Sequence, residues 1–261
     1  MSDAVRYDVA DGVATVTINR ADAMNSADES VRLGMRAAFD QAATDSAVRA
    51  VVLTGAGRAF CVGQDLKELE PLYASPDPEL GDIVGEFHEA VRALARLPKP
   101  TIAAVNGAAA GAGVSLALAC DFRIASDKAS FTMAFSKIGL VPDSGASWAL
   151  PRLVGTAKAM EMLILSEPVR APEALEIGLV TRVVPADALE SEAHAFAAAL
   201  AAGPTLAYGW TKQLLSLAET ATLDDSLDRE HELQSAAGRT KDHVNAVASF
   251  LAKEPPVFEG R

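Results

Sequence analysis

Cysteine is scarce in this sequence. Only Cys61 and Cys120 occur, and each lies in an apolar stretch. Two such thiols do not make the disulfide framework that stabilises small secreted proteins, so that class is excluded. The same scarcity favours a reducing compartment, and we predict a cytoplasmic protein.

Long uninterrupted hydrophobic runs are also missing. A membrane-spanning helix requires about 18 or more consecutive apolar residues. The longest candidate, TIAAVNGAAAGAGVSLALAC (101–120), is broken by Asn106 and by glycines. The first residues, MSDAVRYDVADG, show no apolar signal segment. We therefore expect no membrane partner.

Basic residues are too few for a nucleic-acid-binding protein. Lys and Arg number 23 against 35 Asp and Glu, which gives a net charge of −12 with both signs mixed along the chain. Nucleic acids and anionic membranes require clustered cations. The charge argues against both as main partners, but an anionic small ligand needs only a few local cations.

Metal-ligand patterns are absent as well. The four histidines, His88, His194, His231 and His243, lie on helix-like stretches without HxxxH spacing or a His/Cys cluster. We predict no metal site and histidines that are solvated or lie at the edge of the core. Ser144 has no histidine nearby in the sequence, so a nucleophilic triad has little support.

The sequence does contain enough apolar residues, 50%, for a large core. GVATVTINR (12–20) alternates with the period of a half-buried strand, and Ser26 with Glu29 predicts a capping box that opens a helix to about Asp45. Residues 71–81 contain three prolines and predict a loop. Further strands are predicted at 49–55, 101–105 and 121–126, and further helices at 82–97 and 111–119. This alternation predicts an α/β fold with a parallel, buried sheet.

The pattern changes towards the C-terminus. After GLVTRVVP (178–185) the strand signals stop, and helical patterns fill residues 187–252. We therefore place a boundary near residue 200, with 1–200 as an α/β core and 201–261 as a helical appendage. The appendage is amphipathic, so it must pack on its own core or on a neighbouring subunit.

Two glycine-containing stretches each precede a predicted helix. In AFCVGQDL (59–66), Gly63 allows a tight turn that leaves the Gln64 N–H free, and NGAAAGAGVSLAL (106–118) opens a second helix. The spacing is not that of a dinucleotide-binding GxGxxG motif. A plain turn and close helix packing are the simpler explanations. Together, one backbone N–H from each stretch predicts an oxyanion hole, which suits a thioester enolate.

A single carboxylate, Asp143, stands in FTMAFSKIGLVPDSGASW (131–148). Aspartate often caps a helix, and a helical pattern begins shortly after it. Alternatively, Ser144 caps that helix and Asp143 faces a pocket. Phe131, Met133, Phe135 and Leu140 would then supply apolar walls that raise the pKa of the carboxyl group.

AFCVGQDL, LPKPTIAAVNGAAAGAGVSLALACDFRIAS and IGLVP followed by RLVG occur in the order and spacing of one family. Over nearly its whole length the chain resembles the crotonase (enoyl-CoA hydratase/isomerase) superfamily. The resemblance implies a spiral of ββα units with a C-terminal helical appendage, trimers or hexamers, and an acyl-CoA substrate with no separate cofactor. It implies an oxyanion hole from the N–H groups of Gln64 and Ala112. It also implies substrate-binding positions at Ala23, Val62, Asp65, Leu66, Lys67, Gly111 and Phe135. Candidate cations for the CoA nucleotide are Arg20, Lys67 and C-terminal lysines of a neighbouring subunit.

The sequence departs from the hydratase members of that family. Their two catalytic glutamates fall at Ser115 and Phe135, neither of which can act as an acid or base. Hydration usually divides its proton transfers between two groups, so efficient hydration is not expected. One carboxylate suffices for an isomerase, and Asp143 falls where some family isomerases carry an aspartate. The resemblance therefore implies an isomerase that shifts a double bond or rearranges a ring epoxide, with Asp143 as the proton shuttle.

Three other activities stay open. A hydratase would have to recruit another acid, such as Glu68 or Glu70. A non-catalytic acyl-CoA-binding or scaffold protein would need no acid at all. Family dehalogenases use an aspartate at this position as a nucleophile. They also need a Trp eight residues earlier and a His on the preceding long helix, and the corresponding residues expected in this chain are Phe135 and Arg92.

Overall fold

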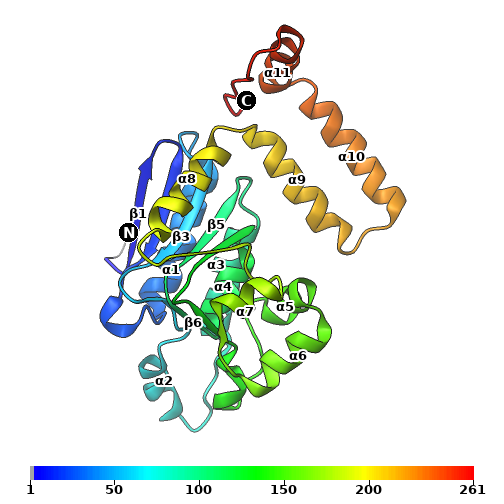
Figure 1. The fold of residues 1–261 in the computed structure, drawn as a ribbon. Helices are drawn as coiled ribbons and strands as arrows, with labels where there is room; N and C mark the ends of the chain where they lie inside the picture. The colour runs from blue at the N-terminus through cyan, green and yellow to red at the C-terminus, as the bar shows by residue number, and fades with distance from the viewer. Residues whose placement is uncertain (1–2) are drawn as a thin grey trace.

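The core is a mixed sheet covered by helices on both faces (Figure 1). The computed structural model describes residues 3–261. All neighbouring strands of its larger sheet are parallel except the first pair. In spatial order these six strands are β1 (Val5–Ala10), β2 (Val13–Ile18), β3 (Ala50–Gly55), β5 (Thr101–Val105), β7 (Phe122–Ser126) and β10 (Arg182–Val184).

A second, smaller sheet is built from four short strands, the first three of which directly follow strands of the larger sheet. Its order is β4 (Ala59–Cys61), β6 (Ala108–Ala110), β8 (Ser130–Thr132) and β9 (Val169–Arg170). The pairs β3–β4, β5–β6 and β7–β8 each place their first strand in the larger sheet and their second in the smaller one. Helices follow these pairs, so the chain winds as a spiral of ββα units, and the predicted α/β fold is confirmed.

Helices on opposite faces of the larger sheet enclose two hydrophobic clusters. The main cluster joins one face of the sheet to α1 (Glu29–Thr44), α3 (Gly81–Ala95) and α4 (Ala112–Ala119). The other face packs on α8 (Leu189–Ala201). The remaining helices of the core are η1 (Ala21–Ala23), α2 (Leu66–Tyr73), η2 (Ala134–Ile138), α5 (Ala146–Val154), α6 (Thr156–Leu165) and α7 (Ala171–Glu176).

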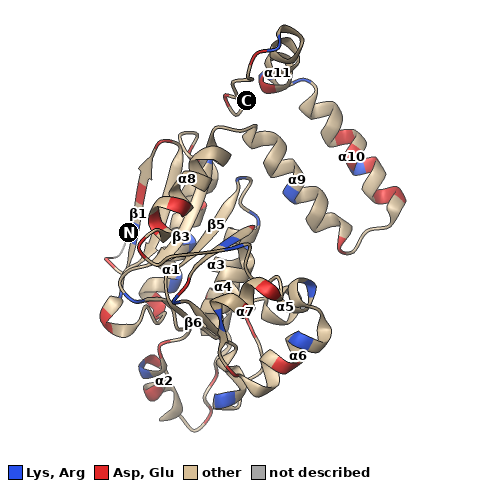
Figure 2. Cartoon of the chain, in the orientation of Figure 1, with Lys and Arg blue, Asp and Glu red and all other residues tan. Residues whose placement is uncertain are grey.

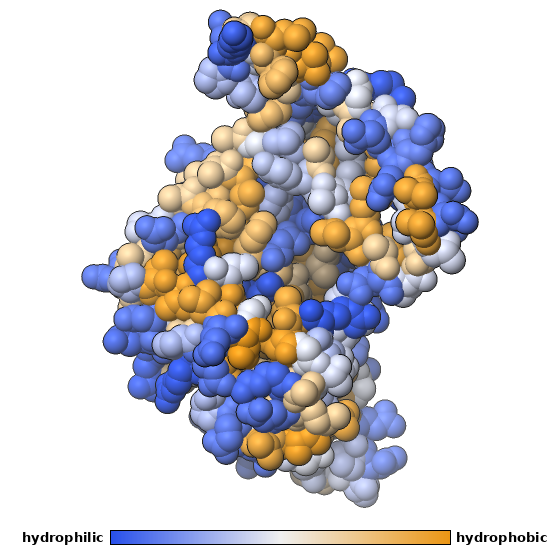
Figure 3. All heavy atoms as spheres, turned by 45° about the vertical axis from the view of Figure 1, so that its right-hand side comes forward, coloured by the Kyte–Doolittle hydropathy of each residue, from blue (hydrophilic) through white to orange (hydrophobic). Residues whose placement is uncertain are grey.

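Three further helices form an arm that extends from the core in Figure 1: α9 (Thr205–Ala218), α10 (Leu223–Ala237) and α11 (Lys241–Ala252). Charges of both signs are scattered over the molecule, while α10 is mainly acidic (Figure 2). Apolar surface gathers on the arm (Figure 3), where Leu223, Phe250 and Leu251 are each more than 70% exposed. No helix in residues 3–261 combines the length and apolar character needed to cross a bilayer.

Three local predictions are wrong in detail. Strand β2 is buried on both faces rather than half-buried, because α8 covers the second face. Asp28, not Ser26, caps α1 by accepting a hydrogen bond from the Val31 N–H, while the Ser26 hydroxyl bonds to Asp65 instead. The predicted loop at 71–81 begins later, because α2 continues through Pro71 to Tyr73.

Candidate active site

A cavity of about 470 Å³ opens between helices α2 and α3 and the segment that connects β8 to α5. Apolar side chains from both helices, including Leu69, Ile83 and Phe87, form much of its wall. Most of the residues predicted for the site from the sequence lie together in its lining: Ala23, Val62, Gln64, Asp65, Leu66, Lys67, Ala112, Phe135 and Asp143. Gly111, also predicted, stands immediately before α4 as its N-cap residue rather than in the lining.

The side chain of Asp143 lies in this cavity and does not cap a helix. Helix α5 begins at Ala146 with Gly145 as its N-cap residue, and no side chain caps it. Asp143 contributes only its backbone carbonyl, which accepts a hydrogen bond from the Ala146 N–H at 3.0 Å. Its Oδ1 atom is buried and meets no hydrogen-bond partner within residues 3–261. Neither of the two capping alternatives applies, because Ser144 does not cap α5 either.

The surroundings of Asp143 favour its neutral form. Burial raises the pKa of Asp143 above its ordinary value, while the neighbouring Ser144 hydroxyl and any positive charge on His88 oppose that rise. Phe135 and Leu140 belong to the apolar wall, as predicted. Phe131 and Met133 do not line the cavity, because they are fully buried in the main hydrophobic cluster behind it. A carboxyl group with a raised pKa is suited to accept and return a proton near neutral pH.

His88 is the residue that the sequence analysis missed. It projects from α3 and its Nε2 accepts a hydrogen bond from the Ser144 N–H at 3.4 Å. The histidine that approaches the aspartate from the long helix is therefore His88, and assigning that place to Arg92 was wrong. Arg92 is exposed and pairs with Glu89. In residues 3–261 no group of His, Cys, Asp and Glu side chains is arranged to hold a metal ion.

Gly63 brings the chain at Gln64 close to the start of α4. Gly63 has φ +86°, and a Cβ atom there would lie 2.9 Å from the Ala110 carbonyl oxygen and 3.4 Å from the Ala112 nitrogen. Parallel pairing of Gln64 with Ala27 uses the N–H of Ala27 and of Asp65, which leaves the Gln64 N–H directed away from that strand. Ala112 is the first residue of α4, so its N–H has no partner inside the helix.

Ser115 and Phe135 stand at the positions where the resemblance implies hydratase glutamates, and each makes a different kind of contact. Ser115 is 1% exposed and donates a hydrogen bond from its hydroxyl to the Asp143 carbonyl oxygen. Phe135 is 6% exposed and lines the cavity beside Gly111. One position supports the backbone at Asp143, and the other makes the cavity wall apolar.

Charged residues at the rim divide into paired and unpaired groups. Asp65 caps α2 and forms an ion pair with Arg20 at 2.9 Å, so neither side chain is free for a ligand. Burial tends to raise the pKa of Asp65, but hydrogen bonds from Arg20, the Lys67 N–H and Ser26 lower it overall. Lys67 and Lys137 line the cavity, and no ion pair holds either ammonium group in the described part of the chain. Those two lysines, rather than Arg20, can meet an anionic ligand.

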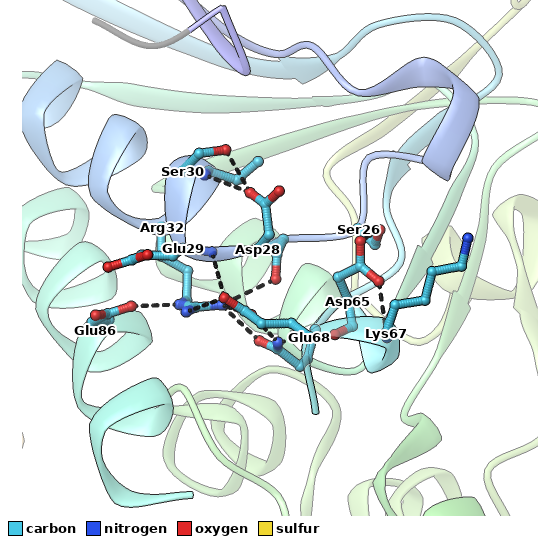
Figure 4. Close-up of polar contacts among 12 residues, drawn as sticks. Ser26, Asp28, Glu29, Ser30, Arg32, Asp65, Lys67, Glu68 and Glu86 are labelled. Carbon is cyan, nitrogen blue, oxygen red and sulfur yellow. Dashed lines mark hydrogen bonds and ion pairs between the residues drawn. The ribbon is translucent and has the colours of Figure 1, made fainter. Parts of the chain in front are cut away.

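Glu68 and Glu70 are not placed to act in the cavity. Glu68 is not part of the cavity lining and points towards Arg32 of α1, with which it forms an ion pair at 2.7 Å (Figure 4). Burial acts to raise the pKa of Glu68, but hydrogen bonds from Arg32, Gln64 and the Glu29 N–H lower it overall. Glu70 is exposed and lies outside the cavity lining. Asp65 and Asp143 are therefore the carboxylates of the lining, and Asp65 is already paired.

Comparison with known proteins gives a consistent result over the full length of the chain. The family model for enoyl-CoA hydratase/isomerase matches residues 8–261. The 1,2-epoxyphenylacetyl-CoA isomerase of Escherichia coli (strain K12) is 44% identical over 262 residues and covers 100% of both chains. The 4-chlorobenzoyl coenzyme A dehalogenase-2 of Arthrobacter sp. is 36% identical over 94% of this chain and 89% of its own.

Solved structures agree with this assignment. A structure named as an enoyl-CoA hydratase/isomerase from Mycobacterium abscessus superposes with a TM-score of 0.94 at 42% identity, covering 99% of this chain and 100% of that one. The predicted resemblance is thereby confirmed: the chain is a member of the enoyl-CoA hydratase/isomerase (crotonase) superfamily of enzymes that act on acyl-CoA thioesters.

Proposed function

We propose that this protein is an acyl-CoA isomerase in which Asp143 carries the proton. The observation that supports this most directly is the unpaired, buried Oδ1 of Asp143 in an apolar cavity whose other carboxylate is already paired with Arg20. A relative with 44% identity is named an isomerase, which favours the same class of reaction.

The proposed reaction moves the double bond of a 3-enoyl-CoA into conjugation with the thioester. The Asp143 carboxylate removes a proton from C2, and the electron pair of that C–H bond delocalises through C3 and C4 and onto the thioester oxygen. The N–H groups of Gln64 and Ala112 stabilise the resulting dienolate oxygen. The neutral Asp143 carboxyl then returns the proton to C4, the electrons flow back to form the C2–C3 double bond, and no external acid is consumed.

We also infer the finer class of substrate from the relatives. The E. coli relative is named for a ring-epoxide thioester, 1,2-epoxyphenylacetyl-CoA. The apolar walls of the cavity suit an aromatic or partly saturated ring, and Lys67 and Lys137 suit the phosphates of CoA. Ala146 is fully buried and lies outside the cavity lining, so its methyl group does not reach the substrate.

The replacement Asp143→Asn tests the proposal. It preserves the shape of the side chain but removes the base, so kcat/KM for a 3-enoyl-CoA should fall by roughly 10²–10⁴-fold. Affinity for a saturated acyl-CoA, measured by calorimetry, should stay near the wild-type value. Wild-type rates in the Asn variant would refute the assignment of Asp143.

Hydration and simple binding are tested with the same protein. Incubation with crotonyl-CoA should give little 3-hydroxyacyl-CoA, because the cavity offers no second free carboxylate. Production of 3-hydroxyacyl-CoA at ordinary enzyme rates would favour a hydratase. Acyl-CoA binding without turnover of any enoyl-CoA would instead favour a non-catalytic binding or scaffold protein.

We further propose that residues 201–261 form an appendage that assembles the protein into trimers or hexamers. The exposed apolar side chains on α10 and α11 support this, because such surface is normally covered in an assembly. Sedimentation of the purified protein tests it, and a monomer at micromolar concentration would refute it.

A further inference from the structure

Arg32 is an arginine buried in α1 beside the candidate active site. Its side chain is 2% exposed, and its guanidinium group lies between α2 and α3 (Figure 4). Nε donates to Glu86 of α3 at 2.7 Å, while Nη1 and Nη2 donate to the two carboxylate oxygens of Glu68 in α2 at 2.7 Å and 3.1 Å. The ring of Phe87, which lines the cavity, lies 5.6 Å from the guanidinium carbon.

These ion pairs connect both helices of the cavity wall to one side chain. Glu68 of α2 contacts Arg32 and is not part of the cavity lining, whereas Leu69, the next residue of the same helix, lines the cavity. A two-point contact with a planar guanidinium fixes orientation as well as distance. Arg32 therefore sets how α2 is rotated, and through Glu86 it also holds α3.

The amide group of Gln64 bonds to the same cluster through both its oxygen and its nitrogen. Its Oε1 accepts a hydrogen bond from Arg32 Nη1 at 3.0 Å, and its Nε2 donates to Glu68 Oε2 at 2.5 Å. Arg32 also donates to the Ala27 carbonyl oxygen at 3.2 Å, and Ala27 is the residue paired with Gln64. The side chain and the local backbone of Gln64 are thus held by one buried cation.

We propose that Arg32 is a positioning residue for the oxyanion hole. It acts through Glu68 and the side chain of Gln64 to hold the Gln64 N–H in line with the Ala112 N–H. This inference rests on the proposed function, because it assigns a support to a hole that the proposed reaction requires. A displacement of about 1 Å in such a group can lower the rate by roughly 10²-fold.

Two conservative variants test this proposal, one at each partner of the Arg32–Glu68 ion pair. Arg32→Lys keeps the charge but cannot contact Glu68 at two points and Glu86 and Gln64 as well. Glu68→Gln keeps the shape of the side chain and removes its charge. Glu68 is the partly exposed partner of the pair, so this variant provides a test even where Arg32→Lys fails to fold. The matched control is Arg36→Lys, one turn along α1, which pairs with Asp40 and with Glu89 of α3 but contacts neither α2 nor Gln64.

The first readout is independent of Asp143. A 3-oxoacyl-CoA ionises to an enolate when an oxyanion hole binds it, and the enolate changes the ultraviolet absorption of the thioester. The second readout is the division of any loss between kcat and KM with a 3-enoyl-CoA. We expect Arg32→Lys and Glu68→Gln to lose most of the enolate absorption and to lower kcat by roughly 10–100-fold. KM should change by less than about threefold in both variants, and Arg36→Lys should match wild type.

The outcomes separate this inference from the proposed function. If wild type ionises the probe and both variants do so equally well with unchanged kcat, Arg32 is merely structural and the inference is wrong, while the proposed function stands. If wild type itself binds the probe without forming the enolate, the oxyanion hole is wrong and the inference fails with it.

Discussion

The hydroxyl group of Ser115 donates a hydrogen bond of 3.2 Å to the backbone carbonyl oxygen of Asp143. These residues are 28 positions apart, on α4 and on the segment that leads into α5. The resemblance to the family places a hydratase glutamate at Ser115, whose hydroxyl is insufficiently acidic to perform proton transfer. Ser115 instead joins the helix that carries Ala112 to the residue proposed as the base.

Replacement of Ser115 by alanine should therefore lower the rate, although Ser115 itself transfers no proton. The loss of one hydrogen bond costs about 1 kcal/mol of unfolding free energy. The Asp143 segment should become less well positioned, and kcat should fall by roughly 3–10-fold with little change in KM. Urea unfolding and steady-state kinetics with a 3-enoyl-CoA measure the two effects.

Ser166→Ala is a matched control for that prediction. Ser166 is also fully buried, and its hydroxyl also donates to a backbone carbonyl, that of Met133. Its hydroxyl contacts Met133 and Ser136, at the start of the segment between β8 and α5, and not Asp143 itself. The control should lose similar stability and keep kcat near wild type, and an equal loss of kcat in both variants would show that Ser115 has no specific role.

The raised pKa of Asp143 predicts the pH dependence of the reaction. As a base, Asp143 must be ionised, so kcat/KM should fall as the pH is lowered through its pKa. Burial raises that pKa, so the midpoint of the acid limb should lie above the value of about 3.9 that is ordinary for aspartate. A pH–rate profile measures the midpoint, and a limb at or below the ordinary value would contradict the role given to burial.

The same shift predicts how Asp143 affects stability. A carboxyl group whose pKa is raised by folding stabilises the native state below its unfolded pKa, and this contribution is lost as the pH rises through the folded value. Asp143→Asn does not titrate, so its unfolding free energy should exceed that of wild type near neutral pH. The difference should shrink below about pH 4. A constant difference across this range would mean that Asp143 does not titrate as inferred.

The sequence predicted those elements whose residues repeat with a clear period. The alternation in 13–18 and the apolar run at 50–55 became β2 and β3, because strand periodicity is local. Strands β6, β8 and β9 contain two or three residues each, which is too short for any period to show. Their existence depends on pairing with one another in the second sheet.

The candidate site was predictable where the chain bends at glycine and where motif spacing carried a resemblance. It was not predictable where distant side chains meet. Ser26 satisfies the local capping rule, but its hydroxyl group donates a hydrogen bond to Asp65, which is 39 residues away. His88 and Ser144 are 56 residues apart, and only the packing of α3 on the Asp143 segment brings them together.

His88 should influence both the stability and the pH profile. His88→Leu leaves the buried Ser144 N–H without its acceptor, which costs about 1–3 kcal/mol. His88→Gln can supply an oxygen to the same N–H and should be nearly as stable as wild type. In its protonated form, which gives up the hydrogen bond from Ser144, His88 lowers the pKa of Asp143; both variants lose that form, so the acid limb should move to higher pH in each. His194→Gln, on α8, is the control and should change neither property.

Gly113 tests whether the close contact between α4 and β4 determines the position of the Ala112 N–H. A Cβ atom at this position would lie 1.9 Å from the carbonyl oxygen of Cys61, which belongs to the backbone of β4 and cannot move aside alone. Gly113→Ala should therefore push α4 from β4, lower the unfolding free energy by about 3 kcal/mol, and separate the Ala112 N–H from that of Gln64.

Gly85→Ala is the matched helical control for Gly113→Ala. A Cβ atom at Gly85 in α3 would meet no atom of residues 3–261 within 4 Å, so alanine should stabilise the helix by roughly 0.5–1 kcal/mol. Thermal unfolding and the enolate absorption of a bound 3-oxoacyl-CoA distinguish the two variants. Since only Gly113 lies at the contact between α4 and β4, a Gly113→Ala protein that keeps the enolate signal would show that this contact does not determine the geometry of the oxyanion hole.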